Sequence, residues 1–102
     1  MAILYVTEYS DEGQTVRGMA PVAAVNATTV DQTPVTFGAT TQSAAFASTT
    51  VLVRIHTNSI CSIAFGTNPT ATTSNKRMAA DQTEYFSVPV GQSYKVAAII
   101  NT

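Results

Sequence analysis

Short runs of this chain alternate apolar and polar side chains with a period of two, and no window carries the 3.6-residue apolar stripe of an amphipathic helix. The clearest run, residues 51–56, places Val51, Val53 and Ile55 on one face and Leu52, Arg54 and His56 on the other. Successive side chains of a strand point to opposite faces, so this period indicates strands with one buried face. Val and Thr, which favour a pleated backbone, are abundant. We therefore expect an all-β protein.

The runs follow one another at a spacing of about 8 to 12 residues, with turn signals between them, which is typical of β-sandwiches and small barrels. We expect residues 1–102 to form one domain, a single antiparallel β-sandwich of the jelly-roll type. The expected strands are residues 3–9, an irregular edge strand in 16–25, 30–37, 51–56, 60–65, 84–90 and 94–100. Runs 51–56 and 60–65 are separated by a short polar break and are predicted to form an antiparallel hairpin.

The remaining segments are expected to be connections. Residues 11–14 form a predicted turn, residues 38–50 a long surface connection anchored by Phe46, and residues 67–82 a polar loop. Within the start of that loop, Pro69 restricts its own φ and that of Asn68, so residues 66–71 are predicted to form a fixed turn.

Alternation within four of the runs predicts which side chains form the core. The expected core residues are Val53, Ile55, Ile63, Phe65, Phe86, Val88 and Val96, with Val90 on the same face as Phe86. In residues 3–9, Ile3, Tyr5 and Tyr9 share one face while Leu4 and Val6 share the other. Because both faces are apolar at the start of this strand, we expect it to be covered on both sides or to lie against a partner.

Charge and targeting signals limit the choice of partners. Only 11% of the residues are charged, the net charge is −1, and the basic residues are scattered apart from Lys76 and Arg77. Binding of nucleic acid through phosphate neutralisation is therefore not expected. The start of the chain has no basic n-region, and the apolar run 96–100 is far shorter than the roughly 20 residues of a membrane span. We expect a soluble protein made in the cytoplasm, with no membrane partner.

The chain offers few residues for catalysis or metal binding. His56 is its only histidine and Cys61 its only cysteine, so neither a zinc site nor a nucleophile with a histidine base is expected. The alternation places His56 on a solvated face and Cys61 among buried apolar residues. We expect no enzymatic activity, no cofactor and no metal.

The acidic residues are predicted to be structural or solvated. Glu8, Asp11 and Glu12 lack the ligand spacing of a calcium loop and are expected to lie in a solvated turn. Asp81 and Glu84 flank a strand start, and no feature sets them as an acid/base pair.

The last sixty residues resemble a group of small bacteriophage virion proteins. The resemblance rests on Ser-Ala-Ala-Phe at 43–46, residues 53–55, the run 61–66 ending in Phe-Gly, Asn-Pro-Thr-Ala-Thr at 68–72, Glu-Tyr-Phe at 84–86, and then Val88, Gly91 and residues 96–97. It implies a structural protein of a tailed phage, of the capsid decoration (cement) type, which binds the major capsid protein on the exterior of the virion. It also implies the absence of enzymatic activity and of a cofactor. A neck or tail position is the alternative within the virion.

The low charge and the two-sided first strand also suit a protein that packs against copies of itself or against a lattice. We expect a homo-oligomer, a trimer or a dimer, with partner-binding residues Ile3, Leu4 and Tyr5 and, in the polar loop, Lys76 and Arg77. A carbohydrate-binding β-sandwich is the alternative from a different functional class, and Tyr85 is the expected outward ring for it.

Overall fold

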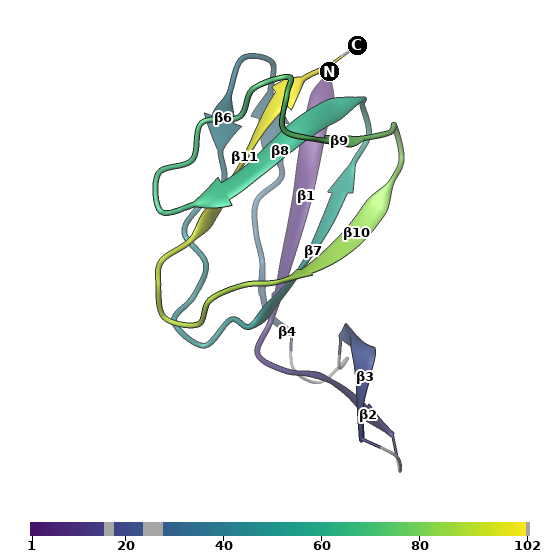
Figure 1. The fold of residues 1–102 in the computed structure, drawn as a ribbon, viewed down its shortest axis with the longest axis vertical. Coiled ribbons are helices and arrows are strands. Elements are labelled where there is room, and N and C mark those ends of the chain that lie inside the picture. Colours follow the sequence, from purple (N-terminus) through teal and green to yellow (C-terminus); the bar gives the residue numbers. More distant parts are fainter. Residues whose placement is uncertain (16–17, 24–27, 102) are drawn as a thin grey trace.

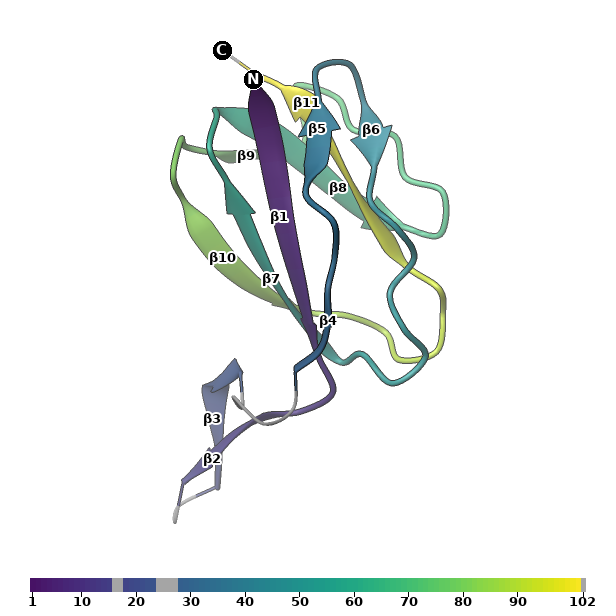
Figure 2. The same ribbon diagram turned by 180° about the vertical axis from the view of Figure 1, so that it is seen from behind.

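A computed structural model of the chain describes residues 1–15, 18–23 and 28–101. These residues form eleven β-strands and no helix, which confirms the all-β prediction. Two antiparallel sheets lie face to face in a β-sandwich-like arrangement (Figure 1, Figure 2). A separate two-stranded sheet consists of β2 (Glu12–Thr15) and β3 (Gly18–Ala23). The turn predicted over residues 11–14 is therefore wrong, because most of it belongs to β2.

The five-stranded sheet is built around β1 (Ala2–Tyr9). One edge of β1 pairs with β7 (Leu52–Thr57), and β7 pairs with β10 (Thr83–Ser87). The other edge of β1 pairs with two short strands in turn, β4 (Thr28–Asp31) and β5 (Val35–Phe37). The single strand predicted over residues 30–37 is thus interrupted between these two, where Pro34 has no N–H to donate to the ladder.

The second sheet has four strands in the order β6 (Thr41–Gln42), β11 (Lys95–Ile100), β8 (Cys61–Gly66) and β9 (Lys76–Met78). Strand β9 lies inside the segment predicted to be a polar loop. Only Met78 of its three residues is buried, so the segment carries no alternating pattern that would indicate a strand.

The predicted hairpin of residues 51–56 and 60–65 is wrong, because β7 and β8 belong to different sheets. Both strands have a buried apolar face, with Val53 and Ile55 on β7 and Cys61 and Ile63 on β8. Pairing them across the break would have placed these faces side by side in one layer. The chain instead crosses at residues 58–60 to the facing sheet, so the two apolar faces cover each other.

The core contains buried residues from both sheets. Val53, Ile55, Ile63 and Val96 are buried as predicted, whereas Phe65, Phe86 and Val88 are partly buried and pack against the core. The Phe65 ring lies 4.9 Å from Phe86 and 6.4 Å from Phe46 between ring centroids, so it joins the two sheets to the long connection. Phe46 is buried, as expected of an anchor. Leu52, expected on the outward face of its strand, is also buried, at the register position between Tyr9 and Ser87 of the two neighbouring strands. Val90 is 54% exposed, because β10 ends at Ser87, before Pro89.

Glu8 is buried in the interior and not in a solvated turn, which corrects the sequence prediction. Its Oε1 accepts hydrogen bonds from the backbone N–H of Ala47 and the hydroxyl of Thr50, both at 2.7 Å. Its Oε2 accepts one from Nε2 of Gln32 at 2.8 Å, and Gln32 in turn binds the backbone of Ala44 through both amide atoms. The carboxylate therefore holds the break between β4 and β5 against the connection between β6 and β7.

Replacing this carboxylate by an amide tests its role. In Glu8→Gln, the new NH2 group must face another hydrogen-bond donor, either Nε2 of Gln32 or the N–H of Ala47. If the Gln32 amide turns over to offer its oxygen, its NH2 group then faces the N–H of Ala44. We expect a loss of about 1 to 3 kcal/mol in the free energy of unfolding, because a buried hydrogen-bonding group loses its partner. Urea denaturation followed by circular dichroism measures this loss.

Glu84→Gln is the matched control. Glu84 forms a salt bridge with Lys76 at 3.1 Å and accepts a hydrogen bond from Nε2 of Gln82 at 2.8 Å, but both charged side chains are partly exposed, so water can replace a lost partner and the expected loss is below about 1 kcal/mol. Equal losses in the two variants would contradict a special role for Glu8.

Candidate functional site

The outer faces of the two sheets differ in what lies on them. On the four-stranded sheet, the residues that point away from the core include Ser62, Ala64, Ala97 and Ile99. Although they face outward, Ser62 and Ala97 are fully buried. Residues 67–75, which we call the covering loop, lie on this side of the sheet, and Nδ2 of Asn101 donates to the hydroxyl of Ser62 at 2.7 Å and to the carbonyl of Thr73 in the loop at 3.2 Å. Figure 1 shows it running from the end of β8 past β6 and β11 to β9.

Hydrogen bonds hold the covering loop on this sheet. Nε2 of Gln42 on β6 donates to Oδ1 of Asn68 at 2.8 Å and to the carbonyl of Pro69 at 2.9 Å. The N–H of Ala71 donates to the hydroxyl of Thr40 at 2.8 Å. Pro69 and Ala71 are buried, which agrees with the prediction of a fixed turn in residues 66–71.

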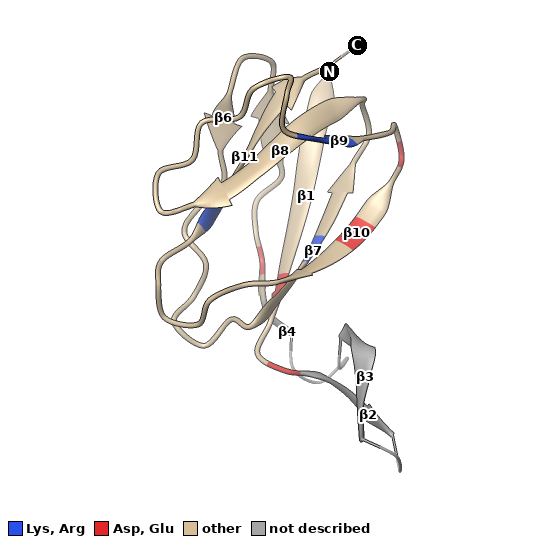
Figure 3. Ribbon diagram, in the orientation of Figure 1, with Lys and Arg blue, Asp and Glu red and all other residues tan. Residues whose placement is uncertain are grey.

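The outer surface of the covering loop is neutral and rich in hydroxyl and amide groups. Its exposed members are Thr67, Asn68, Thr70, Thr72, Thr73, Ser74 and Asn75. Arg77 follows on β9, is exposed, and pairs with Ser62, so it lies on the same outer face. The charged residues on the strands of this sheet are Lys76 and Arg77 on β9 and Lys95 on β11 (Figure 3). This face can form many hydrogen bonds without the cost of burying unpaired ions.

The outer face of the five-stranded sheet carries larger polar and aromatic residues. The strand register places Thr83, His56 and Tyr5 in one row across the sheet, and Tyr85, Arg54, Thr7 and Asp31 in the next. Tyr5 is 38% exposed and Tyr85 is 44% exposed. This face is therefore open to solvent, in contrast to the face under the covering loop.

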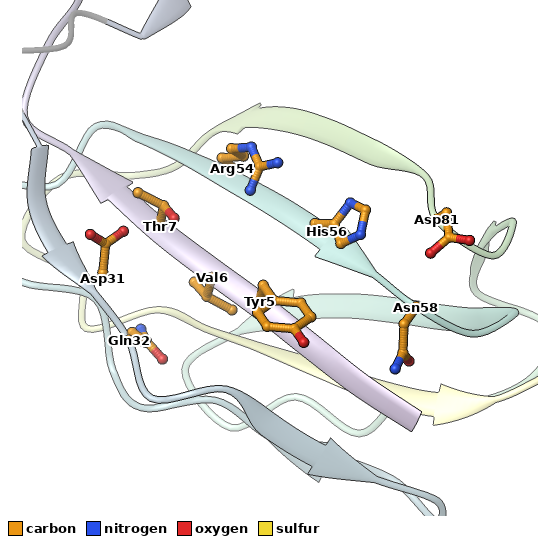
Figure 4. Close-up of a pocket in the computed structure, with 9 residues that line it drawn as sticks. All are labelled: Tyr5, Val6, Thr7, Asp31, Gln32, Arg54, His56, Asn58 and Asp81. Atoms are coloured by element: carbon orange, nitrogen blue, oxygen red, sulfur yellow. The ribbon is translucent and has the colours of Figure 1, made fainter. Parts of the chain in front are cut away.

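A shallow hollow of about 480 Å³ lies on this open face (Figure 4). It is lined by Tyr5, Val6, Thr7, Asp31, Gln32, Arg54, His56, Asn58 and Asp81. These residues come from β1, β7, the edge at β4 and the connections that follow β7 and β9. The hollow combines a phenol ring, an imidazole, a guanidinium and two carboxylates, a mixture that binds polar ligands by hydrogen bonds.

Contacts within the open face fix several of its side chains. Nδ1 of His56 lies 2.7 Å from the hydroxyl of Thr83, and the His56 ring packs against Tyr5 with 5.8 Å between centroids. The pKa of Tyr9, in the neighbouring row, is raised by burial and, to a smaller extent, by Tyr85 and Asp31, while Arg54 lowers it. These ionisable groups therefore influence one another across one sheet face.

The structure separates the predicted partner-binding residues. Leu4 is fully buried, so its side chain belongs to the core and cannot contact a partner. Tyr5 lies on the open face and Ile3, half-buried, points to the same side. Arg77 lies on the outer face of the other sheet, and Lys76 forms the salt bridge with Glu84 that links the edges of the two sheets. One flat partner surface cannot touch both groups.

His56 and Cys61 lie where the sequence predicted. His56 lies on the outer face, and Cys61 is a buried free thiol. Across the described residues, His, Cys, Asp and Glu form no group of three or more that could hold a metal ion. Nor does that part of the chain contain a helix long and apolar enough to cross a membrane.

Comparisons with known proteins leave the family open. No protein-family model matches the chain, and neither the curated proteins nor the solved structures include a significant match. The resemblance to phage virion proteins therefore stays a prediction.

Sequence reasoning missed the hollow because its residues are far apart in the chain. Asp31 and Arg54 meet on one face only through the register of β4, β1 and β7. The alternation did mark Arg54 and His56 as outward residues of one strand, but it only placed Tyr5 on the same face as Ile3 and Tyr9 of another strand, which was expected to be covered on both sides. The pairing of these two strands was the missing information.

Removing the side chain that holds the covering loop is expected to loosen it. In Gln42→Ala, the loop loses the hydrogen bonds to Asn68 and Pro69, each worth about 1 kcal/mol. Amide hydrogen exchange in residues 70–73 should accelerate about tenfold through local opening. The matched control is Gln92→Ala, at an exposed position in the connection before β11. Unchanged exchange in Gln42→Ala would contradict the role of this side chain.

Cys61 is expected to be chemically inert in the folded protein. Burial raises the pKa of its thiol, and a hydrogen bond with the side chain of Thr57 lowers it to a smaller extent. The thiolate is the reactive form, so iodoacetamide at about pH 8 should label Cys61 slowly in the native state and fully in urea. Rapid labelling of the native protein, detected by mass spectrometry, would show that Cys61 is not in the core.

Proposed function

We propose that this chain is a non-enzymatic structural protein of a bacteriophage virion, a capsid decoration subunit with a jelly-roll-type β-sandwich. It binds the major capsid protein on the exterior of the shell. The observation that carries the proposal is the covering loop, a fixed and neutral surface whose exposed residues are hydroxyl and amide side chains. Part of this loop, residues 68–72, also carries the resemblance to phage virion proteins.

The covering loop suits contact with a lattice for two physical reasons. Its backbone is already held by Gln42 and Thr40, so binding costs little ordering entropy. Its side chains exchange hydrogen bonds with water for hydrogen bonds with the shell, and no unpaired ion has to be buried. Arg77 at its border adds one exposed cation that can pair with an acidic group of the shell.

Binding of this kind stabilises the shell by linkage. A subunit that binds only the intact shell contributes about 2.7 kcal/mol per site at a hundredfold excess over Kd. Many equivalent sites on one particle add their contributions. The protein therefore acts as a cement without any catalytic step.

Self-association as a trimer or a dimer is part of the proposal. Strand β10 is the last strand of the five-stranded sheet, and its outer edge offers backbone groups to another strand. Sedimentation equilibrium measures the mass directly, and a monomer at the concentration used for particle binding would overturn this part alone.

A carbohydrate-binding function is the second candidate. The exposed rings of Tyr5 and Tyr85, on the same face as the hollow, favour it. A protein that binds glycans but not phage particles would place this candidate first.

Charge reversal on each outer face identifies the face that binds the shell. Purified protein is mixed with particles that lack it, and bound protein is measured after sedimentation. In Arg77→Glu, we expect binding to the particles to weaken about tenfold or more, because a border cation becomes an anion beside the same shell surface.

Arg54→Glu is the matched control, since it makes the same substitution on the open face. We expect it to bind particles like the unmodified protein. Absence of binding by the unmodified protein would overturn the proposed function, and weakening in Arg54→Glu alone would assign shell binding to the opposite face.

A further inference from the structure

The hollow on the open face lies on the side of the molecule opposite the covering loop. Its residues belong to the outer face of the five-stranded sheet, whereas the covering loop and Arg77 lie on the outer face of the four-stranded sheet. A protein bound to a surface through the covering loop therefore still exposes the hollow. The hollow can bind a ligand whether or not the shell is the partner of the covering loop.

Arg54 is the cation of the hollow. Within the described part of the chain, Lys76 and Glu84 form a salt bridge, with nitrogen and oxygen within 4.0 Å of each other. Arg54 forms no salt bridge with any described residue. Asp31 stands in the same row, but Thr7 of β1 lies between them. Two strand spacings, about 9 to 10 Å, thus separate the Arg54 and Asp31 positions. A guanidinium without a carboxylate partner is suited to a bidentate contact with a ligand carboxylate.

Tyr5 and His56 form the second part of the hollow. Their rings pack at an angle of 51°, and Figure 4 shows both on the same side of the sheet as Arg54. The hydrogen bond to Thr83 uses Nδ1 of His56, so Nε2 remains for a ligand. The partly exposed Tyr5 ring offers an apolar surface beside these polar groups. A ligand with an apolar ring face and a polar rim matches this combination.

Asp31 and Asp81 supply hydrogen-bond acceptors at two sides of the hollow. Ionised carboxylates accept hydrogen bonds from hydroxyl groups but repel phosphates and strongly acidic chains. A ligand with many hydroxyls for these acceptors and one carboxylate placed at Arg54, away from Asp31, fits the hollow, and this is the chemistry of a sugar acid.

We infer that the hollow binds an acidic saccharide, a sugar residue that carries one carboxylate. The carboxylate accepts hydrogen bonds from the guanidinium of Arg54. Hydroxyl groups of the ring donate to Asp31 and bind Thr7 and Nε2 of His56, and the C–H face of the ring packs on Tyr5. Binding is reversible and involves no covalent step.

Titration of the complete chain with matched sugars tests this inference. The probes are the methyl glycosides of glucuronic acid and N-acetylneuraminic acid, with methyl glucoside as the neutral counterpart of the glucuronide. At about 10 mM, above the millimolar Kd of a weak single-sugar site, we expect an acidic probe to shift the amide resonances of Tyr5, Thr7 and His56 in 1H–15N spectra.

Two substitutions of the same kind separate the hollow from the rest of the surface. Arg54→Gln should weaken binding of the acidic probe at least about tenfold, because the charged hydrogen bonds to the carboxylate are lost. Arg77→Gln removes a cation from the opposite face and should leave the affinity unchanged. Spectra without the probe report whether each variant keeps the fold.

Three outcomes would overturn the inference. The first is that neither acidic probe shifts any amide resonance. The second is that the glucuronide and the glucoside shift the amide resonances equally and that these shifts persist in Arg54→Gln. The third is that only amide resonances of residues outside the hollow shift. None of these outcomes bears on shell binding through the covering loop, which the particle assay measures separately.

Discussion

Hydrogen bonds from the edge of one sheet decide which face of the molecule is covered and which is open. Gln42, Thr40 and Asn101 hold residues 67–75 on the outer side of the four-stranded sheet, where Ser62 and Ala97 are buried. Tyr5, Arg54 and the neighbouring residues of the other sheet line an open hollow. One fold thus presents two chemically different surfaces, a neutral hydroxyl-rich one and a polar aromatic one.

The buried carboxylate of Glu8 joins two connections at the end of the molecule opposite to the chain termini. It ties the connection after β6 to the break in the strand pairing beside β1. A charged group is costly to bury unless hydrogen bonds compensate it, and here backbone and side-chain donors converge on both oxygens. The path of the long connection, and with it the position of the buried Phe46, depends on this residue.

The sequence predicts the strand class and much of the core because alternation is a local signal. The period of two places four apolar residues on the inward faces of their strands, and all four are buried: Val53, Ile55, Ile63 and Val96. Alternation does not say which sheet a strand joins, so the crossing at residues 58–60 was missed. Nor does it distinguish a buried carboxylate from a solvated one, because the partners of Glu8 lie 24 to 42 residues away in the chain. The hollow likewise depends on strand register, which no short segment encodes.

If the two outer faces have separate roles, an image reconstruction of particles carrying the bound protein will show it. Fitting the structure into the density shows which face touches the shell. We expect the covering loop and Arg77 to contact the major capsid protein while Tyr5, Arg54 and His56 face the solvent. Density that places the hollow against the shell and the covering loop outward would contradict it.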